Sequence, residues 1–328
     1  MTDIDRTDTS LKGSPAPAPR PSRGAGEVLI LGSVNHDRFV TVDRLPAAGE
    51  TITALSASEG IGGKGANQAV AAALAGARVT FAGAVGDDAS GALARQTLVR
   101  MGVDDHPLRT MNTPTGAAFI TVDEAGENTI VVLPGANGTV GPNALSDIGA
   151  REPSVVVTQG ELPITAITAA AEFAAAHGSR FVLNLAPVLE VPAEVLRQAD
   201  PLIVNEHEAA GILECDPPTS VTGALALSER LIGSVRSLVI TIGSAGAVVQ
   251  AAGAPPLHIP APTPPGPVVD TTGAGDAFVG VLAARLAEGE SLHASAQTAA
   301  RAASISVSRA GTMTSYPGAD EMDAWPPV

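Results

Sequence analysis

The sequence predicts an α/β fold in which a doubly wound, mostly parallel sheet is flanked by helices and carries a small β-sheet lid. Three features predict it: short continuous apolar runs rich in β-branched residues, Ala-rich stretches between them, and two segments with strand-like alternation of residue type. Continuous β-branched runs suit parallel strands that are covered on both faces. Strands that alternate with helices along the chain indicate a parallel sheet.

The first buried strand covers residues 28–32 and ends in a glycine turn. Further buried strands are predicted at 154–158, 181–185, 202–205 and 238–241, and Ala-rich helices at roughly 65–77, 87–101, 165–177, 205–213 and 222–234. The segments at about 38–58 and 115–133 interrupt this rhythm. We expect them to form a β layer that projects from the main sheet, as a lid or a dimer surface.

The length of 328 residues is enough for one large α/β domain or two small ones. Residues 1–26 are rich in Ser, Thr, Pro, Arg and Asp and are expected to be a disordered arm. The folded domain is expected to cover 27–318, with 319–328 as a C-terminal tail. Hydrophobic residues make up 45% of the 328 residues and aromatic residues only 2%, so the core must be built mostly from Ala, Val and Leu.

Charge and residue usage exclude several classes of protein. No apolar run approaches the ~18–20 residues of a membrane span, the N-terminus lacks a signal-peptide pattern, and the single Cys215 excludes an intrachain disulfide. We therefore expect a cytoplasmic protein. A formal net charge of −15 argues against a nucleic-acid partner. Attraction for any phosphate must then be local, from backbone amides, a helix terminus or bound cations.

The most informative feature is the glycine turn of residues 270–276, which leads directly into an apolar helical run. Such a turn leaves backbone N–H groups without partners at the positive end of the helix dipole, where they can bind an anion. A carboxylate at Asp276 would repel that anion, unless it accepts the proton of a hydroxyl that attacks a bound phosphate. The alternative is an ordinary acidic residue in the first turn of a helix.

A second glycine run, residues 60–68, contains G-x-G-x-x-G. A dinucleotide-binding reading requires a buried strand directly before it and an acidic residue that ends a second strand, and neither pattern is convincing here. No P-loop motif is present. The run instead suits close backbone approach to a polyhydroxylated ligand, with Lys64 and Asn67 as hydrogen-bonding side chains.

Polar residues also follow two predicted strands. Asn35 and Asp37 follow the first strand and Glu161 follows the strand 154–158. Open α/β sheets bind ligands at the carboxyl ends of their strands. These residues are therefore candidate ligand contacts, and the alternative for Asn35 and Asp37 is a simple turn and helix cap.

Together these motifs resemble the ribokinase (PfkB-type) sugar kinase family. Gly62 to Ala69 and Asp270 to Asp276 look like its two signatures, and the further matches keep the family order over about residues 27–318: Asn35-x-Asp37, Gly126-Glu127-Asn128-x-Ile130, Pro134 to Asn137, Asn205-x-x-Glu208 and Thr241 to Gly246. The resemblance implies a ribokinase-like kinase domain with a lid. It also implies ATP-dependent phosphorylation of a sugar, with ribose at O5 as the expected acceptor.

The resemblance implies a role for each matching residue. Asp276 would be the general base, and the amides of Gly273, Ala274 and Gly275 would form the anion hole. The sugar would be bound by Asn35, Asp37, Gly63, Lys64, Asn67 and Glu161. Asn205 and Glu208 would organise magnesium and phosphate, and the nucleotide would lie along Thr241, Ile242, Gly243, Ser244 and Gly246.

The resemblance further implies two ions and a dimer. Mg²⁺ would bind with ATP, mainly through phosphate oxygens. K⁺ would be held mostly by backbone carbonyls of Asp270, Thr272, Ser306, Arg309, Gly311 and Ser315. The alternative for residues 306–315 is a plain C-terminal loop. We expect a homodimer through the lid strands, because an isolated β layer has edges to cover.

Several alternatives remain at this level. The acceptor could be deoxyribose, another pentose or a nucleoside, or the protein could be a sugar-binding sensor without turnover. His36 stands between two predicted sugar contacts and could narrow the pocket, contact a substrate oxygen or point away. Ala300 stands where related enzymes often place a polar side chain near adenine, so the base preference stays open.

Overall fold

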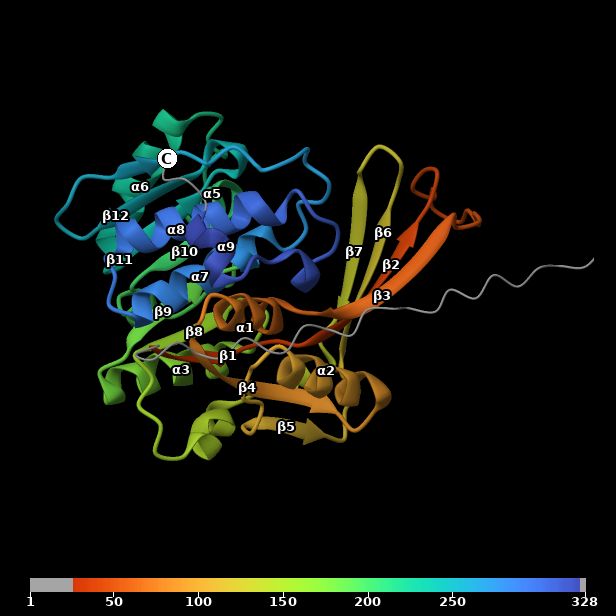
Figure 1. Ribbon diagram of the computed structural model, residues 1–328, viewed down its shortest axis with the longest axis horizontal. Helices are drawn as coiled ribbons and strands as arrows, with labels where there is room; N and C mark the ends of the chain where they lie inside the picture. Colours follow the sequence, from red (N-terminus) through yellow and green to blue (C-terminus); the bar gives the residue numbers. More distant parts are fainter. Residues whose placement is uncertain (1–25, 325–328) are drawn as a thin grey trace, which may run out of the picture.

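The computed structural model describes residues 26–324, and its centre is a nine-stranded sheet in the order β13-β12-β11-β10-β9-β8-β1-β4-β5 (Figure 1). The strands are β1 (Glu27–Leu31), β4 (Arg78–Gly86), β5 (Leu108–Met111), β8 (Val155–Gln159), β9 (Arg180–Asn184), β10 (Leu202–Asn205), β11 (Ser237–Thr241), β12 (Ala247–Ala251) and β13 (Leu257–Ile259). All neighbours pair in parallel except β11–β12 and β12–β13, which are antiparallel. The predicted mostly parallel sheet is confirmed.

Helices cover both faces of this sheet. They are α1 (Lys64–Leu74), α2 (Ala89–Arg100), α3 (Ile164–His177), α4 (Ala193–Leu196), α5 (Glu206–Ile212), α6 (Val221–Leu231), α7 (Ala274–Ala287), α8 (Leu292–Ser306) and α9 (Ala319–Ala324). Alternate residues of β1 belong to different cores: Val28 and Ile30 pack with α1, α7 and α8, whereas Leu29 and Leu31 pack with α3 and the residues of α5 and α6. This division explains why the strand is apolar throughout.

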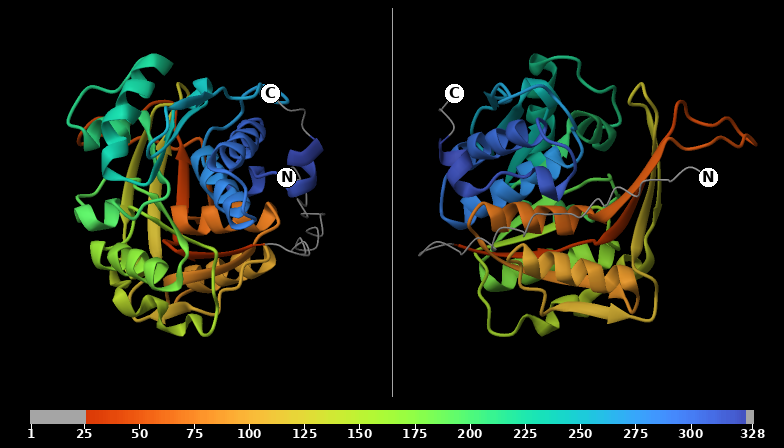
Figure 2. Two further views of the ribbon diagram at one scale, coloured as in Figure 1. Left: turned by 90° about the vertical axis from the view of Figure 1, so that its left-hand side faces the viewer. Right: turned by 45° about the vertical axis from the view of Figure 1, so that its right-hand side comes forward.

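Four further strands form the lid, in the order β3-β2-β6-β7. They are β2 (Asn35–Thr41), β3 (Ser56–Gly62), β6 (Gly116–Val122) and β7 (Asn128–Leu133), and Figures 1 and 2 show them projecting from one end of the main body. Strands β2 and β6 are parallel, while β3 and β7 are antiparallel to their neighbours. The predicted lid is therefore confirmed, although its first two strands begin and end several residues away from the expected bounds.

That shift changes the local structure of two candidate segments. Asn35 and Asp37 were expected to follow the first strand as ligand contacts, with a turn and helix cap as the alternative. They are the first and third residues of lid strand β2. Gly60 and Gly62 lie in β3, with Gly62 opposite Asn35. Consequently the lid sheet itself brings both candidate segments to the junction with the main sheet.

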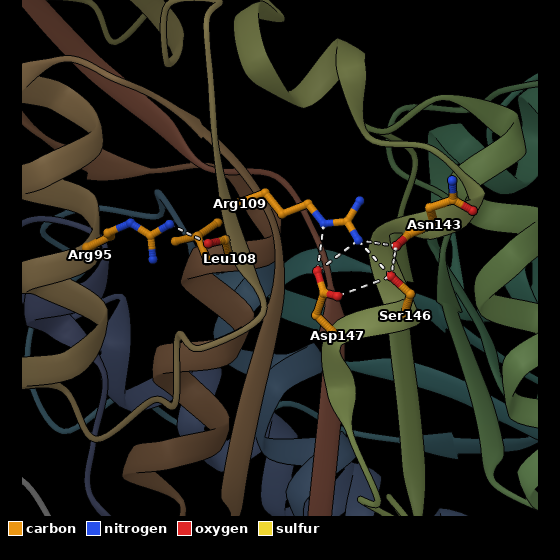
Figure 3. Close-up of polar contacts among 6 residues, drawn as sticks. All are labelled: Arg95, Leu108, Arg109, Asn143, Ser146 and Asp147. Carbon is orange, nitrogen blue, oxygen red and sulfur yellow. Dashed lines mark hydrogen bonds and ion pairs between the residues drawn. The ribbon is translucent and has the colours of Figure 1, made fainter.

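The edge strand β5 is held from two sides by arginines (Figure 3). Arg95 of α2 donates to the Leu108 carbonyl, and Arg109 donates to Asp147 Oδ2 at 2.9 Å and to Ser146 Oγ at 2.8 Å. The first contact satisfies one backbone carbonyl of this edge strand, and the others tie the strand to residues 146–147.

The chain termini differ in how far they can be described. The predicted arm lies almost wholly in residues 1–25, outside the described residues. The segment expected to be a tail contains α9, whose Met322 is fully buried. Between residues 26 and 324 the structure has no helix with the length and apolar character of a membrane span.

Candidate functional site

The glycine turn lies where helix α7 begins, and Asp276 is in the helix's first turn. Gly273 is the N-cap with φ +78°, a left-handed conformation that favours glycine. The Ala274 N–H donates to Thr271 O at 3.3 Å, whereas the N–H groups of Gly273 and Gly275 have no hydrogen bond among residues 26–324. The predicted anion-binding amides are therefore mostly free of protein partners.

Side chains of α1 hold the Asp276 carboxylate. Asn67 Nδ2 donates to its Oδ2 and Gln68 Nε2 donates to its Oδ1, each at 2.9 Å. Asp276 is only 8% exposed, so these two hydrogen bonds are protected from competition with water. The predicted pair of Asn67 and Asp276 is thus brought together from segments 209 residues apart.

The close packing of α1 against α7 and against the end of β1 explains this contact. A Cβ on Gly280, one turn after Asp276, would lie 2.4 Å from the Gln68 carbonyl oxygen. A Cβ on Gly65 would lie 2.5 Å from Gly32 Cα. Since neither contact leaves room for a side chain, the glycines allow the backbone approach that places α1 beside Asp276.

Glu161 joins the start of α1 to the loop after β1. Its Oε2 accepts from Ser33 Oγ at 2.5 Å and from the Lys64 backbone N–H at 3.0 Å. Asp276 is the largest influence on the Lys64 side chain and raises the pKa of its ammonium group, with Glu161 and Glu208 adding to the effect against the opposing effect of burial. Lys64 therefore stays charged among three carboxylates.

Asn35 and Asp37 point from one face of β2 toward this cluster, because alternate residues of a strand share a face. Asn35 Oδ1 accepts from Asn137 Nδ2 at 2.9 Å. A Cβ on Gly62 would lie 1.9 Å from Asp37 Oδ2, so the glycine leaves the space that this carboxyl fills. His36 points to the other face, with Nδ1 2.8 Å from Ser90 Oγ and Nε2 3.3 Å from Glu59.

Burial raises the pKa of Asp37 from 3.8 to about 7, with smaller contributions from the charges of Glu161 and Asp276. The Oδ1 atom of Asp37 is buried without a hydrogen-bond partner among the described residues. A carboxyl group in such a position is ready to bind a hydroxyl donor, because a ligand would satisfy the orphaned oxygen.

The raised pKa predicts a pH-dependent stability. Between pH 4 and 7 the folded protein holds a proton on Asp37 that the unfolded chain has lost, so stability falls as the pH rises through this window. We expect Asp37→Asn to reduce the difference in Tm between pH 5 and pH 8, as measured by scanning calorimetry without ligand. Equal pH dependence in the wild type and the variant would contradict the burial effect. Asp123→Asn, at a lid turn, is the control.

The predicted nucleotide residues lie at neighbouring strand ends, since Asn205 and Thr241 are partners in the β10–β11 register. Asn205 and Glu208 form a capping box on α5, in which Glu208 Oε2 accepts from the Asn205 N–H at 2.7 Å. Burial raises the pKa of Glu208, and Lys64 opposes that shift. Residues 243–246 form the turn between β11 and β12, with φ +56° at Gly243 and +102° at Gly246.

The segments predicted for potassium are joined by Asp270. Its Oδ1 accepts from the Thr272 N–H at 2.9 Å and its Oδ2 from the Gly311 N–H at 3.0 Å. Arg309 donates to the Ser315 carbonyl at 3.3 Å and pairs with Glu321. Five of the predicted residues therefore lie in one connected loop region behind the glycine turn, and the sixth, Ser306, is the last residue of α8, where its carbonyl accepts from the Arg309 N–H at 3.0 Å.

Sequence reasoning assigned no role to several residues that complete the site. Gln68 lay inside the quoted glycine motif, and Ser33, Asn137, Gln159 and Asn184 lay in or beside predicted elements. Gln159 and Asn184 could have been found from the sequence, because each is a polar residue at the end of an otherwise apolar strand. Tyr316 gave no signal, yet its buried hydroxyl would lie 2.7 Å from a Cβ on Gly273.

Comparisons with known proteins show which family the chain is similar to. The model of the pfkB family carbohydrate kinases matches residues 25–319. The chain is 38% identical to the ribokinase of Bacillus subtilis over 302 residues, which is 90% of this chain and 98% of that protein. It is 35% identical to the Schizosaccharomyces pombe ribokinase over 308 residues, 90% of this chain and 96% of that protein.

A solved structure gives the same result for the fold. The Arabidopsis thaliana ribokinase complexed with ribose and ATP superposes with a TM-score of 0.83 at 28% identity, covering 92% of this chain and all of that one (100%).

Proposed function

The chain belongs to the pfkB family of carbohydrate kinases, and we propose that it transfers the γ-phosphoryl group of ATP to O5 of D-ribose. The observation that carries the proposal is the buried Asp276 carboxylate in the first turn of α7. It accepts from Asn67 and lies beside the Gly273 and Gly275 amides, which have no hydrogen bond among residues 26–324. The relatives named ribokinase, and the solved relative with ribose and ATP, favour this sugar over other acceptors.

The proposed reaction uses Asp276 as general base. Its carboxylate accepts the proton of the ribose O5 hydroxyl while O5 attacks the γ-phosphorus, and the bond from that phosphorus to the bridging oxygen of ADP breaks. The amides of Gly273, Ala274 and Gly275 are directed at the charge that develops on the transferring group. In this proposal Asp276 takes part in the reaction, whereas an ordinary acidic residue in the first turn of a helix would only interact with the helix dipole.

The sugar is proposed to bind between the lid and the glycine run. Asp37 offers a carboxyl oxygen without a partner among residues 26–324, and Asn35, Lys64, Asn67 and Glu161 are proposed to supply further donors and acceptors. Gly63, with φ +88°, gives the backbone close access. A site built to hydrogen-bond a hydroxyl rejects an analogue that lacks it, because a buried group is then left unpaired.

The residues around the phosphate side suit Mg²⁺ bound with ATP. Glu208 uses Oε2 for its capping box, whereas its Oε1 makes no hydrogen bond within the described residues and can hold a metal-bound water. Mg²⁺ would neutralise phosphate charge in an otherwise acidic protein. The predicted turn at Thr241, Ile242, Gly243, Ser244 and Gly246 is proposed to lie along the nucleotide.

The loop region behind the glycine turn suits K⁺, because its predicted ligands are oxygen atoms and Asp270 ties both segments together. Asp270, Thr272, Ser306, Arg309, Gly311 and Ser315 would hold the ion. A cation there would fix the geometry of the turn and so the direction of its amides. We propose a cytoplasmic location, where ATP is available.

A coupled assay of ADP release tests the proposed reaction across ribose, deoxyribose, other pentoses and nucleosides, each with Mg-ATP and with Na⁺ or K⁺. We expect the highest kcat/KM on ribose and a higher rate with K⁺. A higher kcat/KM on another acceptor would leave the proposed phosphoryl transfer in place and would show that ribose is not the preferred substrate. Ribose binding without ADP release would instead favour a sensor.

We further propose a homodimer formed by the lid sheets. Phe119 of β6 pairs with Val131 of β7, and the two side chains are exposed on the same face of the sheet. The side chains of Ile130, Val132 and Leu133 are exposed as well. Strand β7 is therefore an exposed apolar edge strand, which can pair with a strand of another chain.

The dimer makes a direct prediction for Val131, which is 66% exposed. We expect Val131→Asp to convert the dimer to a monomer, because a charge at an apolar interface must be desolvated. Light scattering after size-exclusion chromatography measures the mass. Leu257→Asp, at a 50% exposed position of the distant β13, is the matched control and should leave the mass unchanged. A monomeric wild type would contradict the proposal.

A further inference from the structure

Three buried amide side chains form a hydrogen-bonded chain that ends on Asp276. Gln68 Nε2 donates at 2.9 Å both to Asp276 Oδ1 and to Asn184 Oδ1. Gln159 Nε2 donates to Gln68 Oε1 at 2.8 Å, and Asn184 Nδ2 donates to the Ile203 carbonyl at 3.1 Å. Gln68 is fully buried, and the chain connects α1 with the carboxyl ends of β8 and β9.

The two acceptors at the ends of this chain determine which way the NH₂ group and the oxygen of each amide point. The Asp276 carboxylate and the Ile203 carbonyl can only accept, so Gln68 and Asn184 must each direct an NH₂ group at them. The Gln68 oxygen must then face the Gln159 NH₂ group, and the Asn184 oxygen must face Gln68. Gln68 therefore has no alternative orientation that keeps its partners, and it holds Asp276 Oδ1 in one place.

Helix α5 shows what an acidic residue does at the equivalent helical position without such a chain. Glu208 is the third residue of α5 and bonds back to the backbone of its own N-cap. Asp276 is the third residue of α7, and its side chain is one methylene shorter than that of Glu208. Its two oxygens accept from Asn67 and Gln68 of α1 instead of from its own N-cap. The carboxylate is thereby directed toward the sugar-binding side chains and away from its own helix.

We propose that Gln68 is a positioning residue of the phosphoryl transfer, held by Gln159 and Asn184, and that it assigns the two Asp276 oxygens different tasks. Oδ1 stays an acceptor for the fixed Gln68 amide. Oδ2 accepts the O5 proton as the O5–phosphorus bond forms and ADP leaves. The donor to Oδ2 is Asn67, whose own Oδ1 has no hydrogen-bond partner within residues 26–324 and which is not part of the amide chain. This inference rests on the proposed function of Asp276.

The test compares Gln68→Met with Gln250→Met. Both replace a buried, hydrogen-bonded glutamine by an apolar side chain of similar length, but Gln250 lies on β12 and bonds Ser228 and Ala254 O. We expect Gln68→Met to lower kcat for ribose about tenfold to a hundredfold, the effect of a misplaced catalytic group, with KM for ribose and ATP within about twofold. Gln250→Met should change Tm but leave kcat within about twofold.

A double-mutant cycle separates positioning from a general structural effect. If Gln68 acts through Asp276, then adding Gln68→Met to Asp276→Asn should lower the residual kcat by less than about twofold. The same loss in both backgrounds would overturn the inference. So would an unchanged kcat in Gln68→Met while Asp276→Asn is strongly impaired. An unimpaired Asp276→Asn would instead overturn the general-base proposal, and this inference with it.

Gln159→Met keeps the test decisive if Gln68→Met does not fold. It removes the donor to Gln68 Oε1 and leaves the Gln68–Asp276 bond in place. We expect a fall in kcat of several-fold, smaller than for Gln68→Met, again without a change in KM. A purely structural role would change Tm alone, and that result would count against the amide chain.

Discussion

Asp276→Asn is expected to lower kcat for ribose by about 10²–10⁴-fold, the usual contribution of a general base. Asparagine keeps the shape of the side chain but its amide cannot take the O5 proton. Because Asn67 and Gln68 donate to both carboxylate oxygens, the variant also places one N–H group against another donor. Coupled ADP release gives kcat, and calorimetric titration gives the ribose affinity, which should change much less.

The matched control is Asp320→Asn, an exposed acidic residue in the first turn of α9. It removes the same charge from the same kind of helical position, away from the site, and kcat should be unchanged. A similar loss of kcat in both variants would mean that net charge matters and that Asp276 has no role as a base.

Gly273→Ala is expected to lower kcat by about 10²-fold, comparable to the loss of one donor to a developing anion. The residue has φ +78°, and a left-handed conformation costs about 1–2 kcal/mol in any residue with a side chain. The new Cβ would also lie 2.4 Å from Thr312 Cγ2 and 2.7 Å from Tyr316 Oη. The turn must therefore shift and carry its amides away from the phosphoryl position.

Gly289→Ala separates strain from function. Gly289 has φ +88°, follows the other end of α7, and has no atom within 4 Å of a new Cβ. Both variants should lose stability in a denaturant titration, but only Gly273→Ala should lose rate. An unchanged rate in Gly273→Ala would contradict the proposed anion hole.

The sequence predicted the five strands β1, β8, β9, β10 and β11 of the main sheet, because each is a short apolar run. The strands β4, β5, β12 and β13 were not predicted. Apolar β-branched runs such as 154–158 are typical of buried strands, and their alternation with Ala-rich helices along the chain indicates a parallel sheet. The ordered motifs identified the family, and the family is confirmed by the match to residues 25–319. The roles given to Asp276, Asp37 and the other site residues stay predictions.

The parts that could not be predicted depend on contacts between distant segments. Whether Asn35 and Asp37 lie in a turn or in a strand is decided by the pairing of β2 with β3 and β6, and the local sequence pattern does not contain that information. The amide chain joins Gln68, Gln159 and Asn184 across up to 116 residues. The raised pKa of Asp37 likewise follows from burial by the assembled lid and sheet.

Phosphoryl transfer to ribose, followed by ³¹P NMR in the wild type and in Asp276→Asn at equal concentrations, tests the central claim most directly. We predict that the wild type converts ATP and ribose to ADP and ribose 5-phosphate, whose resonance is that of a phosphate monoester on a primary carbon. Asp276→Asn should bind ribose and form that product at least about 10²-fold more slowly. Equal rates in the two proteins, or a wild type that binds ribose and forms no ribose 5-phosphate, would contradict the account.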